Sequence, residues 1–419
     1  MPPERVRHTA IAVVALCFTM NLVARGVGET YAVFLLPLGD EFAWSRGQLT
    51  SVYSIYMAVL GLSAPVGGWV FDRFGPRASY GLGIGCLALG FMGASKASAL
   101  WHFYVCIGVV GGFGATSMGL VTSSALVSRW FRSRLGTAMG ITYAGLNSGV
   151  VVLAPLTQFA IDSVGWRQTY SWLSLGLAVL IVPVLALPWR RIAKGHPDFA
   201  ITARGGTTVG GGTRHRDQDD WTLAQAVRQR AFWGLFAVFF FTAVAVYAVS
   251  LQIVAYLVES GFSPLQAATA FGLAGTLSVG GMASAGWMSD RIGRRATVAI
   301  TFSLTIMGIV LLYLTGRQPS LALLGAFVLC FGFSQGSRGP VISALCAELY
   351  KGTGLGAILG AISVGMGLGA SIGSWVSGVL HDITGGYTAG FALAIAAALL
   401  GLSQFWLVRS LGPGAAARR

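Results

Sequence analysis

The sequence has few charged residues. Only 10% of its 419 residues are Asp, Glu, Lys or Arg, and 55% are hydrophobic, whereas a soluble domain carries roughly 25% charged residues. Most of the chain must therefore face lipid or other helices, which excludes an ordinary soluble protein. A membrane-spanning helix needs about 20 apolar residues, so the chain has room for about a dozen.

Patterns typical of metal sites and disulfides are also missing. The five cysteines lie inside apolar segments without C-x-x-C spacing, which predicts small buried hydrophobic residues; they are Cys17, Cys86, Cys106, Cys330 and Cys346. The histidines fall in predicted loops or tails; they are His8, His102, His196, His215 and His381. We therefore expect neither a metal site nor a histidine relay inside the membrane.

Motifs for nucleotide chemistry and hydrolysis are absent too. The chain has no P-loop that could use ATP, and no G-x-G-x-x-G following a strand. A membrane-embedded hydrolase would need Ser/His or His/Asp sets inside the apolar segments. A sensor would need a signalling domain larger than the 190–230 segment. We expect a protein that is not an enzyme and binds no cofactor.

The net charge of +14 follows membrane topology rather than nucleic-acid binding. Of the 28 Lys and Arg residues, 22 fall in the tails and alternate loops on one side, four on the other side and two inside apolar segments. Positive residues concentrate in cytoplasmic loops. The sequence therefore predicts a multi-pass protein of a bacterial-type cytoplasmic membrane, with both termini in the cytoplasm and no nucleic-acid partner.

The second half of the chain repeats the first. Residues 68–77 (GWVFDRFGPR) return 218 positions later as 286–295 (GWMSDRIGRR). Three further pairs recur at nearly the same offset: Trp44–Gln48 with Phe262–Gln266, Asp162–Trp166 with Asp382–Tyr387, and the glycines 136/140/145/149 with 356/360/365/369. Parallel repeats with a site between them are an arrangement typical of transporters. The glycines, extended by Gly373, predict close helix packing.

Twelve apolar segments predict an all-α integral membrane fold of two pseudo-symmetric six-helix bundles. The predicted helices are 10–38, 47–71, 76–95, 101–127, 134–160, 167–189, 232–258, 264–288, 295–315, 320–347, 353–380 and 387–409. We expect domains at 1–189 and 231–419, joined by a disordered cytoplasmic linker at 190–230. Helix starts carry S/T-x-x-Q capping boxes at Ser45, Thr222 and Ser263.

The repeated hairpins predict a gate on the cytoplasmic side. Free N–H groups at a helix start attract carboxylates, so we expect Asp72 to contact the start of helix 11 near Thr353. By symmetry, Asp290 would contact the start of helix 5 near Arg134. We assign Arg73, Arg129 and Arg291 to the same gate. The alternative is an ordinary solvated hairpin without a gating role. Two in-register copies of the motif make this alternative less favoured than a single copy would.

These hairpins resemble the signature loops of the major facilitator superfamily, and the resemblance covers all twelve helices. A narrower stretch, residues 128–145, is similar to the helix 4–5 signature of the monocarboxylate transporters and their bacterial oxalate/formate relatives. The resemblance implies transport of an organic anion by alternating access. In those relatives helix 8 carries a carboxylate-binding arginine, whereas 264–288 holds no charged residue here.

Three charged residues lie deep in the predicted spans. Arg25 and Glu29 are one turn apart in helix 1, and Arg338 lies in helix 10. Charges at depth are costly and usually face a water-filled cavity, and the resemblance implies that helices 1, 4, 7 and 10 line one. Either arginine could bind a carboxylate, and Glu29 could carry a proton. The alternatives are a structural Arg25–Glu29 pair, and an Arg338 bound to carbonyl groups.

Uncharged polar side chains in the spans are further candidates for substrate contact, although buried Tyr and Asn often only link helices. They are Tyr31, Tyr143, Asn147, Tyr247, Gln252 and Gln335. The combined prediction is a monomeric secondary transporter of small organic anions, favouring monocarboxylates, with a proton as the coupled ion and lipid as its surroundings. The alternative is a proton-coupled exporter of drug-like or amphipathic compounds.

Overall fold

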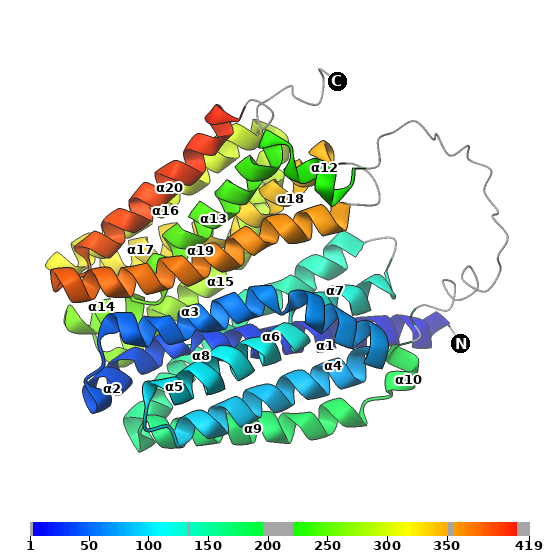
Figure 1. Ribbon diagram of the computed structural model, residues 1–419, viewed down its shortest axis with the longest axis horizontal. Coiled ribbons are helices and arrows are strands. Elements are labelled where there is room, and N and C mark those ends of the chain that lie inside the picture. The colour runs from blue at the N-terminus through cyan, green and yellow to red at the C-terminus, as the bar shows by residue number, and fades with distance from the viewer. Residues whose placement is uncertain (1–2, 132–134, 194, 196–220, 351–354, 409–419) are drawn as a thin grey trace.

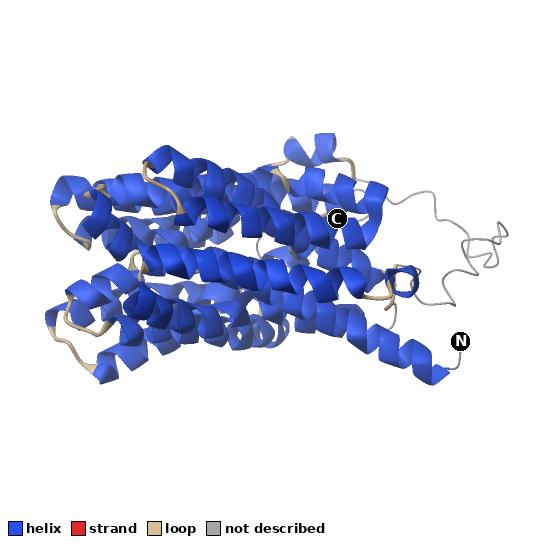
Figure 2. Ribbon diagram, turned by 90° about the horizontal axis from the view of Figure 1, so that it is seen from below, coloured by secondary structure: helices blue, strands red, loops and turns tan. Residues whose placement is uncertain are grey.

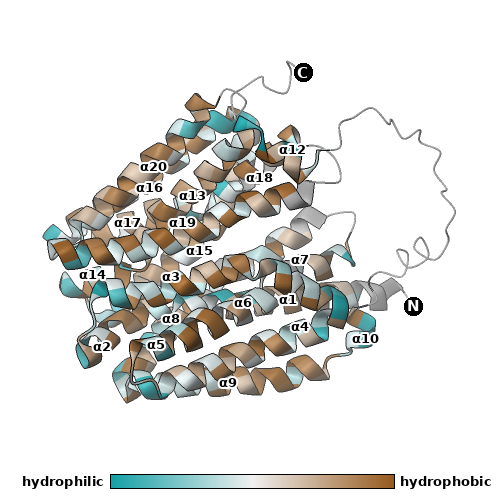
Figure 3. Cartoon of the chain, viewed as in Figure 1, coloured by the Kyte–Doolittle hydropathy of each residue, from teal (hydrophilic) through white to brown (hydrophobic). Residues whose placement is uncertain are grey.

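The computed structural model describes residues 3–131, 135–193, 195, 221–350 and 355–408, and the regular structure in these ranges is helical (Figure 2). A few side chains within them, including those of Asn147 and Asp290, lie outside the description. Long helices run side by side, with hydrophilic residues gathered at their ends (Figures 1 and 3). This is the polarity that a bilayer demands of spanning helices.

The helices follow the predicted spans, except that the predicted helix 47–71 is interrupted at Ser63 and its second part continues past a kink at Gly75 into the next predicted helix. In the first half they are α1 (Pro3–Glu29), α2 (Tyr31–Phe42), α3 (Arg46–Leu62), α4 (Ala64–Ser95), α5 (Leu100–Phe103), the π-helix η1 (Tyr104–Gly111), α6 (Gly112–Met118), α7 (Leu120–Ser128), α8 (Leu135–Val164), α9 (Trp166–Ala186) and α10 (Trp189–Ile192). In the second half they are α12 (Leu223–Val227), α13 (Arg230–Ser250), α14 (Ile253–Glu259), α15 (Pro264–Ile292), α16 (Arg294–Arg317), α17 (Leu321–Gly336), α18 (Arg338–Leu349), α19 (Leu355–Thr384) and α20 (Thr388–Leu407).

The sequence repeat is visible in the backbone. Both hairpins turn at a glycine with positive φ, Gly75 (φ 79°, ψ 175°) and Gly293 (φ 85°, ψ 158°). An L-residue with a side chain is strained there, which explains why each hairpin carries glycine. The predicted capping boxes form at α3, α12 and α15. The predicted linker falls largely outside the described residues, apart from α10, α12 and their flanks.

The sequence did not predict that helices 1, 4, 7 and 10 are interrupted. α1 and α2 meet at Thr30, α6 and α7 at Gly119, α13 and α14 at residues 251–252, and α17 and α18 at Ser337. The breaks fall at matched positions of the two repeats. Short i→i−3 bonds tighten the chain at three of them, such as Gly119 N–H to Thr116 O and Ser337 N–H to Ser334 O. The fourth, at Thr30, has its hydroxyl donating to Val27 O at 2.7 Å.

Because of these interruptions, and because some helices are less apolar than others, fewer than twelve helices in the described part of the chain are long and apolar enough to span a membrane. In the described ranges, nine helices are long and apolar enough to span a membrane. α3 fails because it ends at Leu62, and α17 because it has 16 residues before the break. α15 has the length but is rich in Gly, Ser and Thr. All three lie within helices that the sequence predicts as spans.

Each half packs mainly within itself, and the halves meet along two seams. α1 packs on α8 and α4 on α9, while α13 packs on α19 and α16 on α17. The halves contact each other mainly where α3 meets α19 and α8 meets α15, with a smaller contact between α2 and α14. We call the end at which α10 and α12 lie the linker end, and the end with residues 96–99 and 318–320 the distal end; they are at the right and left of Figure 1.

The predicted close packing by glycines is confirmed at positions 145, 149, 365, 369 and 373, and it is wrong at positions 140 and 360. On α8, a Cβ at Gly145 or Gly149 would collide with backbone carbonyls of α1. On α19, a Cβ at Gly373 would lie 2.8 Å from the Cα of Val244 in α13. Gly360 has no neighbour within 4 Å of such a Cβ. The glycines therefore let α8 rest on α1 and α19 rest on α13 with backbones in contact.

This contact predicts a difference between two equivalent-looking substitutions in α19. Gly373→Ala should destabilise the protein by about 1–3 kcal/mol, because overpacking forces the backbones apart. Gly360→Ala is the matched control and should be neutral or slightly stabilising, since alanine favours a helix over glycine. Thermal unfolding of the purified protein in detergent measures both. Equal melting temperatures for the two variants would contradict the packing role.

Candidate functional site

A buried ion pair lies just before the break in helix 1. Arg25 Nη2 lies 2.7 Å from Glu29 Oε1, one turn further along α1. The hydroxyl of Tyr53, on α3, donates to the other carboxylate oxygen at 2.8 Å. Glu29 is 8% exposed and Tyr53 is 1% exposed. A charged pair buried to this degree is costly unless its hydrogen bonds are satisfied, and Tyr53 supplies one of them.

The same arginine reaches across the boundary between the halves. Its Nη2 donates to the hydroxyl of Tyr247 on α13, and its Cζ lies 5.6 Å from the centre of that ring. Arg25 and Tyr247 each lie shortly before the break in their helix. The pair therefore joins the halves at the level where helices 1 and 7 are interrupted. This is the arrangement expected of a site that two repeats share.

Tyrosines surround the ion pair. The ring of Tyr53 lies 6.3 Å from Tyr31, 5.7 Å from Tyr56 and 6.2 Å from Tyr247. Tyr31 donates its hydroxyl to Leu49 O at 2.9 Å, which fixes helix 1 to α3. The aromatic rings limit the access of water to the pair, which strengthens its electrostatic interactions.

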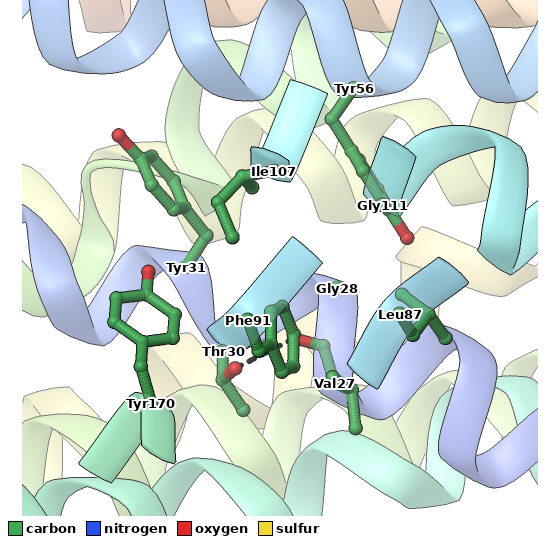
Figure 4. A pocket seen from close by; sticks show the side chains of 10 residues that line it. All are labelled: Val27, Gly28, Thr30, Tyr31, Tyr56, Leu87, Phe91, Ile107, Gly111 and Tyr170. Carbon is green, nitrogen blue, oxygen red and sulfur yellow. Dashed lines mark hydrogen bonds between the residues drawn. The ribbon is translucent and has the colours of Figure 1, made fainter. Parts of the chain in front are cut away.

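A small cavity adjoins these tyrosines inside the first half (Figure 4). Its lining includes Gly28 and Thr30 at the helix 1 break, Tyr56 of α3 and Tyr170 of α9. Among the described residues, the buried hydroxyls of Tyr56 and Tyr170 have no hydrogen-bond partner. The cavity lies within one bundle, beside the ion pair, and not on the boundary between the halves.

The other predicted polar candidates are dispersed. Gln252 is 2% exposed at the helix 7 break, and neither its Nε2 nor its Oε1 has a partner in the described part of the chain. Gln335 donates to Ser250 Oγ at 3.4 Å, so it links α17 to α13. Tyr143 is partly buried on α8. The side chain of Asn147 lies outside the described residues.

The structure does not bring Arg338 together with Arg25. Arg338 is 2% exposed, and its guanidinium lies against α16, where it donates to Thr305 and covers the ring of Phe302 at 4.3 Å. Its Nε and Nη1 have no partner in the described ranges. The residue thus packs inside the second half. The position of Arg338 within the predicted span indicated that it lies deep in the membrane. The direction of its side chain depends on how the neighbouring helices pack, which the sequence did not show.

The hairpin residues predicted to form a gate lie at the linker end. Asp72 and Arg73 are exposed, and Arg73 lies over Trp69, just as Arg291 lies over Trp287 in the second repeat. Arg129 lies 4.8 Å from the centre of the Phe71 ring. The expected contact regions near Thr353 and Arg134, and the side chain of Asp290, lie outside the described residues, so the contacts stay a prediction.

Comparison with known proteins fits this geometry. A model of the Major Facilitator Superfamily matches residues 14–337 and 283–418. The chain belongs to the major facilitator superfamily. It is 28% identical to monocarboxylate transporter 13 of Bos taurus over 402 residues, covering 93% of this chain and 87% of the relative. It is 25% identical to the uncharacterized MFS-type transporter YcxA of Bacillus subtilis, with 93% and 92% covered.

The structural comparison agrees on the fold. A crystal structure of a D-xylose–proton symporter superposes with a TM-score of 0.67 at 15% identity, covering 93% of this chain and 97% of that one. The predicted fold of two six-helix bundles and twelve spans is therefore confirmed. As a member of this superfamily, in the branch that resembles the monocarboxylate transporters, the chain is a transport protein and not an enzyme.

Sequence reasoning missed two residues of this candidate site, Tyr53 and Tyr56. Both lie in the predicted helix 47–71, at i and i+3 on one face. That spacing was a usable signal because residues three apart share a helix face. The partner that makes Tyr53 important, Glu29, comes from another helix, and no spacing within one helix can reveal such a contact.

The two tyrosines give a matched test of the ion pair. Tyr53→Phe should destabilise the folded protein by about 1–3 kcal/mol, because Glu29 loses a buried donor. Tyr56→Phe removes a hydroxyl that has no partner in the described structure, so its effect should be close to zero. Thermal unfolding in detergent compares them. If Tyr56→Phe costs as much as Tyr53→Phe, the bond to Glu29 is not what stabilises this region.

Proposed function

We propose that this protein transports small monocarboxylates together with protons by alternating access, across a bacterial-type cytoplasmic membrane. The observation that carries the proposal is the Arg25–Glu29 pair, buried at the boundary of the halves and bonded across it to Tyr247. The similarity to monocarboxylate transporter 13 supports the class of substrate. The similarity to a sugar–proton symporter supports the fold on which such coupling can operate.

The distribution of positive charge supports the orientation. In the topology that the sequence predicts, 22 Lys and Arg residues fall on the side that includes the linker end and four on the opposite side. Under the positive-inside rule the linker end is cytoplasmic, and both termini are then inside. Asp72, Arg73, Arg129, Asp290 and Arg291 would close that end when the distal end opens, with the aspartates accepting bonds from helix N–H groups.

Arg25 is the better placed of the two buried arginines to bind a substrate carboxylate. It faces the boundary between the halves, and its side chain retains 19% exposure, whereas Arg338 lies inside the second half. A guanidinium binds a carboxylate in bidentate geometry. An arriving carboxylate would compete with Glu29 and with the Tyr247 hydroxyl for the same nitrogen atoms. Binding would thus weaken the bond that joins the halves at the site.

Glu29 is the proton carrier in this scheme. In the absence of substrate its carboxylate is paired with Arg25. A substrate anion that takes over Arg25 releases Glu29, which can then accept a proton. The occupied site would carry Arg25, one anion and a neutral Glu29, so it would be neutral overall. A neutral site is cheaper to move through a low-dielectric interior than a charged one.

Uptake into proteoliposomes tests the proposal as a whole. Labelled pyruvate, lactate, oxalate and an aromatic acid would be offered with and without an inward proton gradient. We expect accumulation of at least one monocarboxylate that depends on the gradient. Proton-driven efflux of amphipathic compounds, with no uptake of any acid, would favour the exporter that the sequence left as the alternative.

Substitutions at Arg25 test separately whether substrate binding needs the positive charge and whether it needs the shape of the guanidinium group. Arg25→Gln should abolish substrate binding, because no cation remains at the boundary. Arg25→Lys should weaken binding by roughly tenfold or more, since an ammonium cannot reproduce the bidentate fork. Isothermal titration with the transported acid measures both, and Arg338→Lys serves as the comparison inside the second half. Normal affinity in Arg25→Gln would remove Arg25 as the carboxylate ligand.

Glu29→Gln separates coupling from binding. The variant should lose accumulation driven by a pH gradient, because the amide cannot take up a proton. It should keep exchange of labelled for unlabelled substrate, which needs no net proton movement. Loss of both activities would indicate a structural pair instead. Retained gradient-driven accumulation would take Glu29 out of the mechanism.

A further inference from the structure

At the distal end, a carboxylate of one half caps a helix of the other. Asp382 lies in the last turn of α19, and its Oδ1 and Oδ2 accept hydrogen bonds from the backbone N–H groups of Arg46 (2.7 Å) and Gly47 (2.6 Å) in the first turn of α3. The first N–H groups of a helix have no partner within it, and they carry the positive end of its dipole. Asp382 therefore satisfies α3 from the opposite bundle.

Two features complete this contact. Gly47 makes room for the carboxylate, because a Cβ there would lie 2.8 Å from Asp382 Oδ2. The side chain of Arg46 forms an ion pair with Glu259, at the end of α14 in the second half. We call Asp382, Arg46, Gly47 and Glu259 the distal latch.

The remaining bonds between the halves show which end is closed. Among the described residues, hydrogen bonds between the two bundles occur at the distal latch, between Ser54 and Ser374 (2.8 Å), and between Arg25 and Tyr247. All of them lie at the level of Arg25 or on its distal side. The structure is thus held together at the distal end, and the latch supplies three of these bonds.

The second repeat has lost the equivalent contact. The counterpart of Asp382 is Asp162 in α8, and the counterparts of Arg46 and Gly47 are Pro264 and Leu265 at the start of α15. Proline has no backbone N–H to donate, and leucine has the side chain that Gly47 lacks. In the described residues Asp162 accepts its bond from Gln158 on its own helix, at 2.7 Å. The latch therefore holds only the seam of α3 with α19.

We propose that Asp382 is the gating residue of the distal end, and that transport requires its carboxylate to leave the start of α3. While the cap is in place, the distal end is closed at the α3–α19 seam. When the halves move apart there, the bonds from the N–H groups of Arg46 and Gly47 to the carboxylate break. Both partners then form hydrogen bonds with water. The described side chains of the α8–α15 seam make no such bond, and this seam opens by separation of its packed surfaces.

The proposal predicts that removal of the Asp382 carboxylate lowers the ratio of molecules with a closed distal end to molecules with an open one. A carboxylate at a helix N-terminus contributes enough that its removal shifts such a ratio by roughly five- to thirtyfold. The ion pair of Arg46 with Glu259 should contribute less, because the Glu259 side chain is 41% exposed and water screens its charge, although the Arg46 side chain is only 12% exposed. The inference concerns a conformational equilibrium, so it is independent of which substrate the proposed function requires.

Distance measurement between the halves tests the latch. Spin labels would be placed at Ser98→Cys and Gln318→Cys, two exposed positions in distal loops of different halves, in full-length protein whose native cysteines are replaced. Double electron–electron resonance in lipid nanodiscs then reports the closed and open populations. The variants are Asp382→Asn, Arg46→Pro and Arg46→Ala, with Asp162→Asn as the matched control from the other repeat.

Arg46→Pro is the most informative variant. It copies the Ser263-Pro264 start of α15, so the helix start remains viable, since proline suits the first helical position. It removes one N–H that Asp382 uses, along with the guanidinium. Arg46→Ala removes the guanidinium alone. The difference between them isolates the backbone bond.

We expect the open population to rise by the stated factor in Asp382→Asn and Arg46→Pro. It should change little in Arg46→Ala and stay at the native value in Asp162→Asn. Native distance distributions in both Asp382→Asn and Arg46→Pro would overturn the proposal. So would a native protein with no population at the closed distance. Equal effects of Arg46→Pro and Arg46→Ala would assign closure to the ion pair and not to the cap.

Discussion

A helix inside a bilayer must satisfy its own backbone, because lipid offers no hydrogen-bond partners. Interruptions are therefore tolerated only where other parts of the protein cover them. This chain follows the constraint: two of the interrupted spans, 100–128 and 230–259, are among the more buried, at 69% and 72% of their apolar windows, against 28% for the continuous 166–186. The breaks define an interior layer, and the charged site lies in it.

Within that layer one arginine is shared by two functions. Arg25 neutralises Glu29, and it also binds Tyr247 across the boundary between the bundles. A ligand that engages the guanidinium changes both interactions at once. In the proposed mechanism a single group would thus couple the charge of the site to the contact between the halves, as coupled transport by a two-state protein requires. Arg338 does not share this position, because its guanidinium is held on α16.

The sequence predicted the spans because apolar length and end signals are local properties. The capping boxes at Ser45 and Ser263, and the glycine turns, could be read directly from short motifs. The Arg25–Glu29 pair was also accessible, since four-residue spacing fixes one helix face. The helix breaks, the bond from Tyr53 to Glu29 and the direction of Arg338 were not, because each depends on side chains contributed by other helices. The same reason explains why the role of Asp382 required the structure.

The backbone contact between α13 and α19 has a mechanical consequence. Glycines seat α19 on α13 so closely that the two helices can hardly slide past each other. α13 carries Tyr247 at one level of the molecule, and α19 carries Asp382 at another. If the two helices move as one unit, a displacement of Tyr247 also moves Asp382 at the start of α3. The fit at these glycines would then determine how tightly the two contacts are linked.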